Sequence, residues 1–153
     1  PGAETVEFPT LLGMESPKLR AYPKETVVAE KVEAIVQLGA TNSRMKDFYD
    51  LLVISRTFPF EGELLRQALS NTFARRGTKL PTGLPVGLTE AFAMDEGKQK
   101  QWAGFLNRSG LDGERTLSGV VAQLVVFLVP PLNHAARGES FETSWDLKSG
   151  WSP

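Results

Sequence analysis

The chain has 153 residues, and 17 lysines and arginines against 18 aspartates and glutamates give a net charge of −1. That balance offers no global argument for binding nucleic acid or a membrane. The absence of cysteine excludes disulfides and thiolate chemistry, and a single histidine, His134, argues against a His-based metal site or a Ser-His-Asp triad. The apolar run over residues 120–132 is too short to span a bilayer, so we expect one cytoplasmic domain without membrane contact.

Two short strands are predicted before the first helix. Residues 4–8 alternate between apolar and polar side chains until Pro9, and residues 19–22 form a second candidate that Pro23 stops. An isolated two-stranded ribbon is only marginally stable, so we expect both strands to extend a larger sheet. Because the chain begins at Pro1 without an initiator methionine, we also expect a segment to be missing upstream.

Three helices are predicted next, from apolar side chains that recur at intervals of three and four residues. Each has a start or stop signal, such as proline at the first turn or glycine after the last. The predicted ranges are residues 24–38 between Pro23 and Gly39, residues 43–57 with Asn42 or Ser43 as the cap, and residues 61–76 before Gly77.

The rest of the chain begins with a connector rich in proline and glycine over residues 78–88. A short helix is predicted from Thr89, another over residues 98–107, and a final long helix that Pro130-Pro131 bends or breaks. The fold class is therefore mainly α with a small N-terminal β element. The expected division is a strand region at 1–22, a helical domain at 23–137 and a flexible tail at 138–153.

Lys31 is the first residue that could take part in chemistry. It lies three residues after Val28 and four before Ile35, inside the apolar stripe of its predicted helix. One interpretation is that its aliphatic stem crosses the stripe and the ammonium reaches solvent. The other is a cation held at the wall of a cleft, where a compact ammonium suits a phosphate.

Asp47 and Asp50 are three residues apart, so they share one face of the second helix at the border of its apolar side. Two carboxylates placed in this way could hold a divalent cation, or one could act as a base. Arg44 and Lys46 could neutralise them instead, since acids near a helix start and pairs at helical spacing are often only structural.

These residues fall in two motifs that resemble those of the AbiEii/AbiGii toxin family of nucleotidyltransferases. The first is Ala29-Glu30-Lys31, and the second is the Arg-x-Lys-Asp-x-x-Asp pattern that runs from Arg44 to Asp50. Their order and short separation are more specific than either motif alone. The resemblance covers about residues 1–57 and is loose beyond Phe58. The family provides the toxin in bacterial abortive-infection, type IV toxin–antitoxin systems.

The resemblance implies the C-terminal helical part of an α+β nucleotidyltransferase-like fold, with residues 1–22 as a remnant of its sheet. It assigns the contact with nucleotide phosphates to Lys31 and catalysis to Asp47. The flanking motif positions are Arg44 and Lys46, expected to bind the nucleotide, and Glu30 and Asp50, expected to support the site.

The family's upstream half supplies a Gly-Ser turn and a paired-acid motif that binds Mg²⁺, and this sequence has neither. No Asp-x-Asp occurs, and Asp112-Gly113-Glu114 has no flanking strand. We therefore expect this portion to lack the metal-binding centre and to be inactive by itself. In the full-length enzyme, Mg²⁺ and an NTP are implied.

The function implied is transfer of a nucleotide from an NTP to an acceptor such as RNA, including tRNA. Asp47 would activate the acceptor hydroxyl or complete the metal site. The implied partner is a separate antitoxin regulator encoded alongside, and direct binding to it is not required.

A different hypothesis is a non-catalytic helical interaction module, in which Lys31, Asp47 and Asp50 form an internal ion-pair network. It requires Lys31 within about 4 Å of a carboxylate in a site closed to solvent. The enzyme hypothesis requires Lys31 and Asp47 to line one open cleft.

Overall fold

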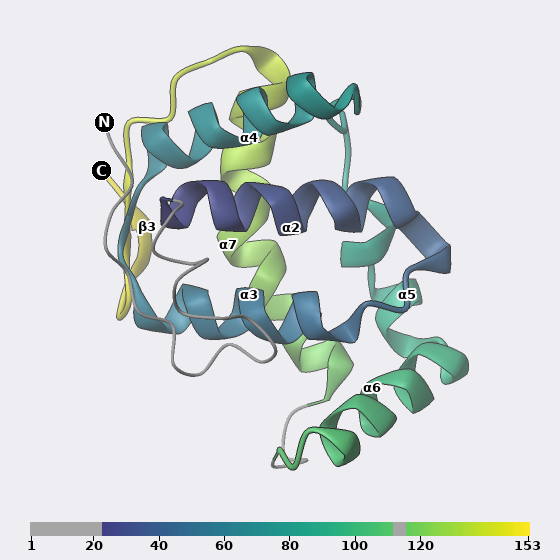
Figure 1. Ribbon diagram of the computed structural model, residues 1–153. Helices are drawn as coiled ribbons and strands as arrows, with labels where there is room; N and C mark the ends of the chain where they lie inside the picture. Colours follow the sequence, from purple (N-terminus) through teal and green to yellow (C-terminus); the bar gives the residue numbers. More distant parts are fainter. Residues whose placement is uncertain (1–22, 112–115) are drawn as a thin grey trace.

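α-Helices make up most of the described chain. The structure is a computed structural model, and it describes residues 23–111 and 116–153 (Figure 1). The strands predicted at residues 4–8 and 19–22 lie outside these residues. The helices are α2 (Lys24–Leu38), α3 (Met45–Thr57), α4 (Gly62–Arg76), α5 (Glu90–Met94), α6 (Glu96–Arg108) and α7 (Leu117–Arg137), with single 3₁₀ turns η1 (Gly39–Thr41) and η2 (Val86–Leu88).

The long helix α7 forms the back of the helical core. In Figure 1, α4, α2 and α3 lie one below another, and α7 crosses behind them. α7 packs on α3, α4 and α5, while α2 packs mainly on α4. Large apolar side chains from these helices are fully buried, and the burial of each one stabilises the folded state by about 1.5–3 kcal/mol. They include Phe48, Leu69, Phe73, Leu124 and Phe127.

The predicted start and stop of the first helix are confirmed, and so is the stop of the third, which begins one residue later than predicted, at Gly62. Val28, Val32 and Ile35 of α2 are 0%, 1% and 1% exposed, as their helical spacing indicates. α4 ends at Gly77, which has a φ of 68° in the left-handed region that other residues adopt only with strain.

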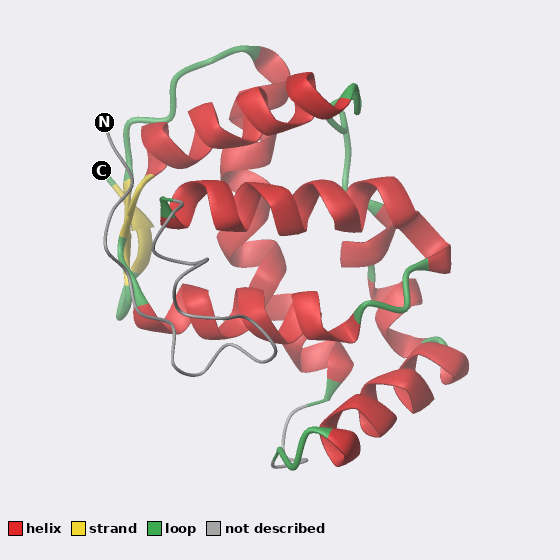
Figure 2. Ribbon diagram, in the orientation of Figure 1, coloured by secondary structure: helices red, strands yellow, loops and turns green. Residues whose placement is uncertain are grey.

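A small antiparallel sheet lies at one edge of the helices (Figure 2). β1 (Phe60–Glu61) pairs with β2 (Ser144–Asp146), which pairs with β3 (Gly150–Ser152). In this register Trp145 lies opposite both Phe60 and Trp151. The prediction of a flexible tail from residue 138 is therefore wrong for the part that forms β2 and β3, because its two tryptophans pack on the core. The fold class, mainly α with a small β element, is confirmed.

Pro130 and Pro131 lie inside α7 and do not break it. Of the two outcomes expected from the sequence, a bend or a break, the break is therefore wrong. A proline removes the N–H that would bond the carbonyl four residues earlier, so Pro131 leaves the Phe127 carbonyl without its helical donor. The indole Nε1 of Trp151 donates to that carbonyl at 2.9 Å. The C-terminal segment thus supplies a hydrogen bond that the proline takes away.

α7 is also longer than the apolar run considered from the sequence. With 21 residues and a mean hydropathy of 1.5 in its most apolar window, it could cross a membrane by length and composition alone. The core helix of a soluble protein passes the same test, and α7 is packed against three other helices. The absence of membrane contact stays a prediction, as does the cytoplasmic location.

Candidate functional site

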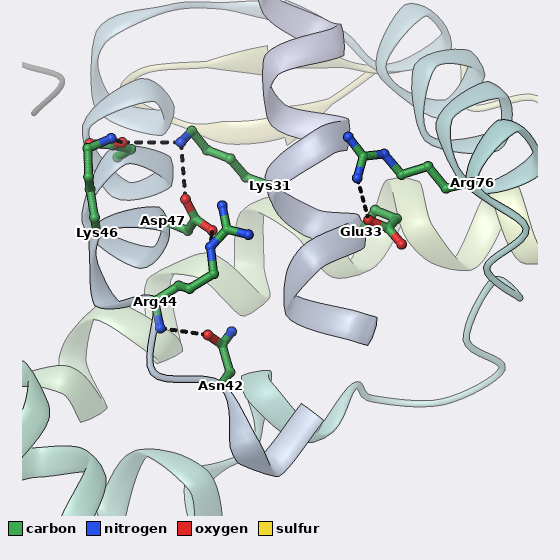
Figure 3. Close-up of polar contacts among 8 residues, drawn as sticks. Lys31, Glu33, Asn42, Arg44, Lys46, Asp47 and Arg76 are labelled. Carbon is green, nitrogen blue, oxygen red and sulfur yellow. Dashed lines mark hydrogen bonds and ion pairs between the residues drawn. The ribbon is translucent and has the colours of Figure 1, made fainter. Parts of the chain in front are cut away.

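The structure brings Lys31 of α2 together with Asp47 and Asp50 of α3. Lys31 Nζ donates to Asp47 Oδ1 and to Asp50 Oδ2, each at 3.2 Å (Figure 3). The three side chains are 9%, 4% and 0% exposed, so they lie mostly below the surface. Helical spacing placed the three on inward faces, and the structure shows that the two faces meet.

Two further cations complete the ion-pair network of Lys31, Asp47 and Asp50. Arg44 Nε lies 3.0 Å from Asp47 Oδ2, and Lys46 Nζ donates to Asp50 Oδ2 at 2.7 Å. Both pairs have the three- or four-residue spacing expected of neighbours on one helix. Removing water from two carboxylates is costly, and here three cations offset that cost.

The chain turns between α2 and α3 in a way that fixes Arg44. Gly39 has a φ of 55°, which ends α2, and η1 follows. Asn42 Oδ1 then accepts a hydrogen bond from the Arg44 backbone N–H at 2.8 Å (Figure 3). The prediction that Asn42 or Ser43 caps the helix is wrong, because Arg44 is the residue before its first turn and makes no side-chain cap bond.

Lys31 and Asp47 also line one hollow, which we call the smaller hollow. Its volume is about 440 Å³, and Ser43, Arg44, Met45, Lys46, Phe105 and Arg108 complete its lining. A larger hollow of about 680 Å³ lies between α2 and α4 and shares Lys31 and Arg44 with the smaller one. The pairing distance required by the interaction-module hypothesis is met, and so is the shared open lining required by the enzyme hypothesis.

Glu30, predicted to support the site, contacts a different helix. It forms ion pairs with Arg75 and Arg76 at the end of α4 and lines the larger hollow. Its neighbour Glu33 is 1% exposed and accepts a hydrogen bond from Thr78 Oγ1 at 2.6 Å. Arg76 Nη1 lies 3.6 Å from Glu33 Oε1 (Figure 3). These contacts bind α2 to α4 and leave the carboxylate of Glu30 outside the Lys31 network.

Sequence reasoning singled out neither Phe105 nor Arg108, and neither lies in the two motifs. Both lie on α6, three residues apart and therefore on one side of that helix. The spacing was visible in the sequence. What could not be seen is that α6 packs on α3 and brings this side to the hollow.

A match to a known family settles which proteins this chain resembles. The family model described as "Nucleotidyl transferase AbiEii toxin, Type IV TA system" matches residues 1–135. The chain belongs to the AbiEii family. No curated protein and no solved structure matches it.

The family match confirms the resemblance found in the two motifs and extends it. It continues through α7 as far as residue 135, well past Phe58, where the motif-based resemblance became loose. Membership indicates nucleotidyltransferase activity as a toxin and implies a nucleotide substrate and a cognate antitoxin. The strands β2 and β3 lie beyond the matched residues.

The described residues do not fit a magnesium site by themselves. Among residues 23–111 and 116–153, no group of three or more acids, histidines or cysteines gathers in a way that could hold a metal ion. Asp47 and Asp50 are already neutralised by Lys31, Arg44 and Lys46 within 3.2 Å. A dication beside those ammonium and guanidinium groups would be repelled.

Proposed function

We propose that the smaller hollow binds the triphosphate of an NTP and that this AbiEii-family protein transfers the nucleotide to an acceptor hydroxyl, such as the 3′ end of an RNA. A tRNA is the acceptor we favour, following the family resemblance. The observation that carries the proposal is the position of the Lys31 ammonium, which contacts both aspartates and lines the hollow.

Lys31 is suited to this role by the hydrogen bonds it already makes. An ammonium has three N–H donors, and two of them are directed to Asp47 and Asp50. The third is left for an oxygen of the bound phosphate. Arg44 and Lys46 line the same hollow, so the polyphosphate would meet three cations from two neighbouring segments.

In the proposed reaction, the acceptor oxygen attacks the α-phosphorus, the bond to the leaving pyrophosphate breaks, and the acceptor's proton moves to Asp47. Phosphoryl and nucleotidyl transfers depend mainly on positioning and on neutralising charge. The incoming phosphates compete for Arg44, which pairs with Asp47 Oδ2 in the free protein, while Lys31 keeps its bond to Asp47 Oδ1. This exchange of partners would leave the Asp47 carboxylate able to accept the proton.

Magnesium is implied by the family, and it would neutralise charge on the phosphates when bound. Because the Asp47 and Asp50 carboxylates do not fit it, we assign no step to the metal and propose that its ligands lie outside the described residues. The sequence has no Asp-x-Asp to supply them, so we also propose that these 153 residues alone are inactive. The antitoxin is proposed to be a regulator that acts on gene expression, for which direct binding to the toxin is not required.

The test is toxicity of the protein expressed from its complete gene in a bacterial host. Lys31→Ala and Asp47→Asn should each abolish growth arrest and the transfer of α-phosphate label from NTPs to RNA. Lys100→Ala is the matched control, since Lys100 is an exposed lysine of α6 paired only with Glu96 among the described residues. It should leave toxicity unchanged. Circular dichroism would show whether each variant is folded.

Retained toxicity in folded Lys31→Ala and Asp47→Asn proteins would reject the roles proposed here. The same result would favour the interaction-module hypothesis, because the ion pairs that hypothesis requires are present.

A further inference from the structure

α6 forms a wall of the smaller hollow that neither family motif contains. Phe105 and Arg108 are its two contributions, and Arg108 is the last residue of the helix. In Figure 1, α6 lies below α3, at some distance from α2 and α4. Any role for this wall therefore depends on how firmly α6 is held against α3.

Contacts of two kinds hold α6 in place. Near its start, Lys98 Nζ donates to the Asn42 carbonyl at 2.7 Å, in the turn that precedes Arg44. Further along, the rings of Phe105 and Tyr49 of α3 pack with centroids 5.9 Å apart. Phe105 is 8% exposed, so this contact belongs to the core. The position of Arg108 relative to α3 is thus fixed by packing on the turn before it.

Among residues 23–111 and 116–153, Arg108 differs from the other cations of the smaller hollow because no acid pairs with it. Lys31, Arg44 and Lys46 each form an ion pair with Asp47 or Asp50. Arg108 is exposed, and no carboxylate of the described residues pairs with it. Its Nη1 would lie 3.1 Å from a methyl group at Gly104, so the guanidinium lies back along its own helix over a residue without a side chain.

The charges around the hollow do not balance. Among the described residues, four cations line the hollow, Lys31, Arg44, Lys46 and Arg108, and the acids paired with them are Asp47 and Asp50, so these six side chains carry a net charge of +2. A planar guanidinium with unused donors is well suited to two oxygens of one phosphate group. The Arg108 guanidinium can therefore bind an anionic ligand without first breaking an ion pair with a described residue.

We propose that Arg108 is a further phosphate-binding residue of this site and contacts a phosphate group of the substrates from the α6 side. The proposal rests on the proposed function, because it takes the smaller hollow as the place where the phosphates bind. The phosphate can come from two sources, the triphosphate of the NTP or a phosphodiester of the nucleic acid acceptor, and the experiment separates them.

The experiment measures equilibrium binding to the complete purified protein with two probes. The first is inorganic tripolyphosphate, followed by the four NTPs, and the second is a short oligouridylate that carries no triphosphate. The variants are Arg108→Ala and Arg108→Lys, with Lys100→Ala as the control on the same helix. Because Arg108 is exposed and unpaired among the described residues, its variants should melt at the same temperature as the wild type.

Loss of a charge-assisted bidentate contact should weaken binding by about tenfold in Arg108→Ala. Arg108→Lys should weaken binding less, because lysine keeps the positive charge and loses only the paired donors of the planar guanidinium. A loss with tripolyphosphate and the NTPs assigns Arg108 to the triphosphate. A loss with the oligouridylate alone assigns it to the acceptor phosphodiester. Both results support the proposal.

Equal binding of both probes by Arg108→Ala and Lys100→Ala would overturn it. Lys31→Ala, measured in parallel, separates this failure from failure of the proposed function. If Lys31→Ala loses binding while Arg108→Ala does not, only the role of Arg108 is wrong. If folded Lys31→Ala binds both probes as the wild type does, the hollow is not the phosphate site, and both proposals fail.

Discussion

Two regions hold the helices of this protein together by different physical means. At the junction of α2 and α3, Lys31 contacts two buried carboxylates, and the side chains that meet there are charged. At the opposite end of α3, Phe127, Trp145 and Trp151 form an aromatic cluster with ring centroids 4.8 to 6.1 Å apart. The first region lines a hollow, whereas the second fills its space with side chains.

The aromatic cluster is expected to stabilise the fold more than the buried ion pairs of Lys31 do. Stacked and tilted aromatic rings gain from burial and need few exact partners. The cluster adds two indole hydrogen bonds, from Trp145 Nε1 to the Ser55 carbonyl at 2.7 Å and from Trp151 Nε1 to the Phe127 carbonyl. Buried ion pairs contribute little net stability compared with apolar side chains of the same size. This weak return in stability is one reason why we propose that the charged cluster beside the hollow binds a ligand.

The largest effect is expected from Lys31→Met, which removes the cation shared by Asp47 and Asp50. Breaking a buried pair in this way costs roughly 3–5 kcal/mol, and we expect the lower end because Arg44 and Lys46 remain. Chemical denaturation would measure the loss. A loss near the roughly 0.5 kcal/mol typical of surface changes would contradict the burial of the network.

The triple variant Lys31→Met/Asp47→Asn/Asp50→Asn tests whether the instability of Lys31→Met comes from the carboxylates left without a cation. With the buried charges gone, it should recover at least half of the stability lost in Lys31→Met, yet it should remain without toxicity. Recovery of toxicity together with stability would mean that the three charged groups serve only folding.

A smaller effect is expected in the aromatic cluster from Trp151→Phe. The ring still packs, but the Phe127 carbonyl freed by Pro131 loses its donor, and a buried unsatisfied carbonyl costs roughly 1–3 kcal/mol. Leu147→Ala is the matched control, since Leu147 lies between β2 and β3 and is 50% exposed. Folded Trp151→Phe should bind tripolyphosphate as the wild type does. Weaker binding would mean that the aromatic cluster affects the hollow, so that binding and packing are not divided between the two regions.

The two regions also differ in how far the sequence could predict them. Lys31, Asp47 and Asp50 were found because each departs from the apolar pattern of its own helix, and two local motifs gave them a family. Their meeting required only that two consecutive helices pack with those faces together. The partners of Trp145 and Trp151 are 90 and 24 residues away, and nothing local indicates them.

The same limit explains the errors at the prolines and in the tail. Pro130 and Pro131 break helices when the freed carbonyls find no donor, and here the donor for one of them comes from β3. The supporting role of Glu30 was taken from the motif alone and stays a prediction. Its ion-pair partners are two arginines some 45 residues further on, which no local pattern indicates. Most helix bounds followed from local signals, whereas the prolines and the tail depend on distant contacts. The cap before α3 is the exception, a local error in which Asn42 bonds to the Arg44 N–H and does not cap the helix.

The smallest expected effect concerns Glu63, which ties the C-terminal segment to the first turn of α4. Hydrogen bonds from the Arg66 side chain, then from Gln67 and from the Phe141 backbone N–H, lower the pKa of Glu63 from 4.5 to about 2. A pKa lowered by folding means that the carboxylate form stabilises the native state. This contribution is present at pH values above 4.5 and is lost as the pH falls from there toward about 2.

Glu63→Gln should therefore melt below the wild type near neutral pH, and the gap should narrow as the pH is lowered through that range. Glu63 is partly exposed, so solvent screening should keep the gap smaller than the loss in Trp151→Phe. Glu139→Gln, an exposed acid before the same segment, is the control and should show no such trend. A gap that stays constant with pH would mean that the charge of Glu63 does not stabilise the segment. The C-terminal end would then depend on packing and on neutral hydrogen bonds, which would sharpen its contrast with the charged Lys31 junction.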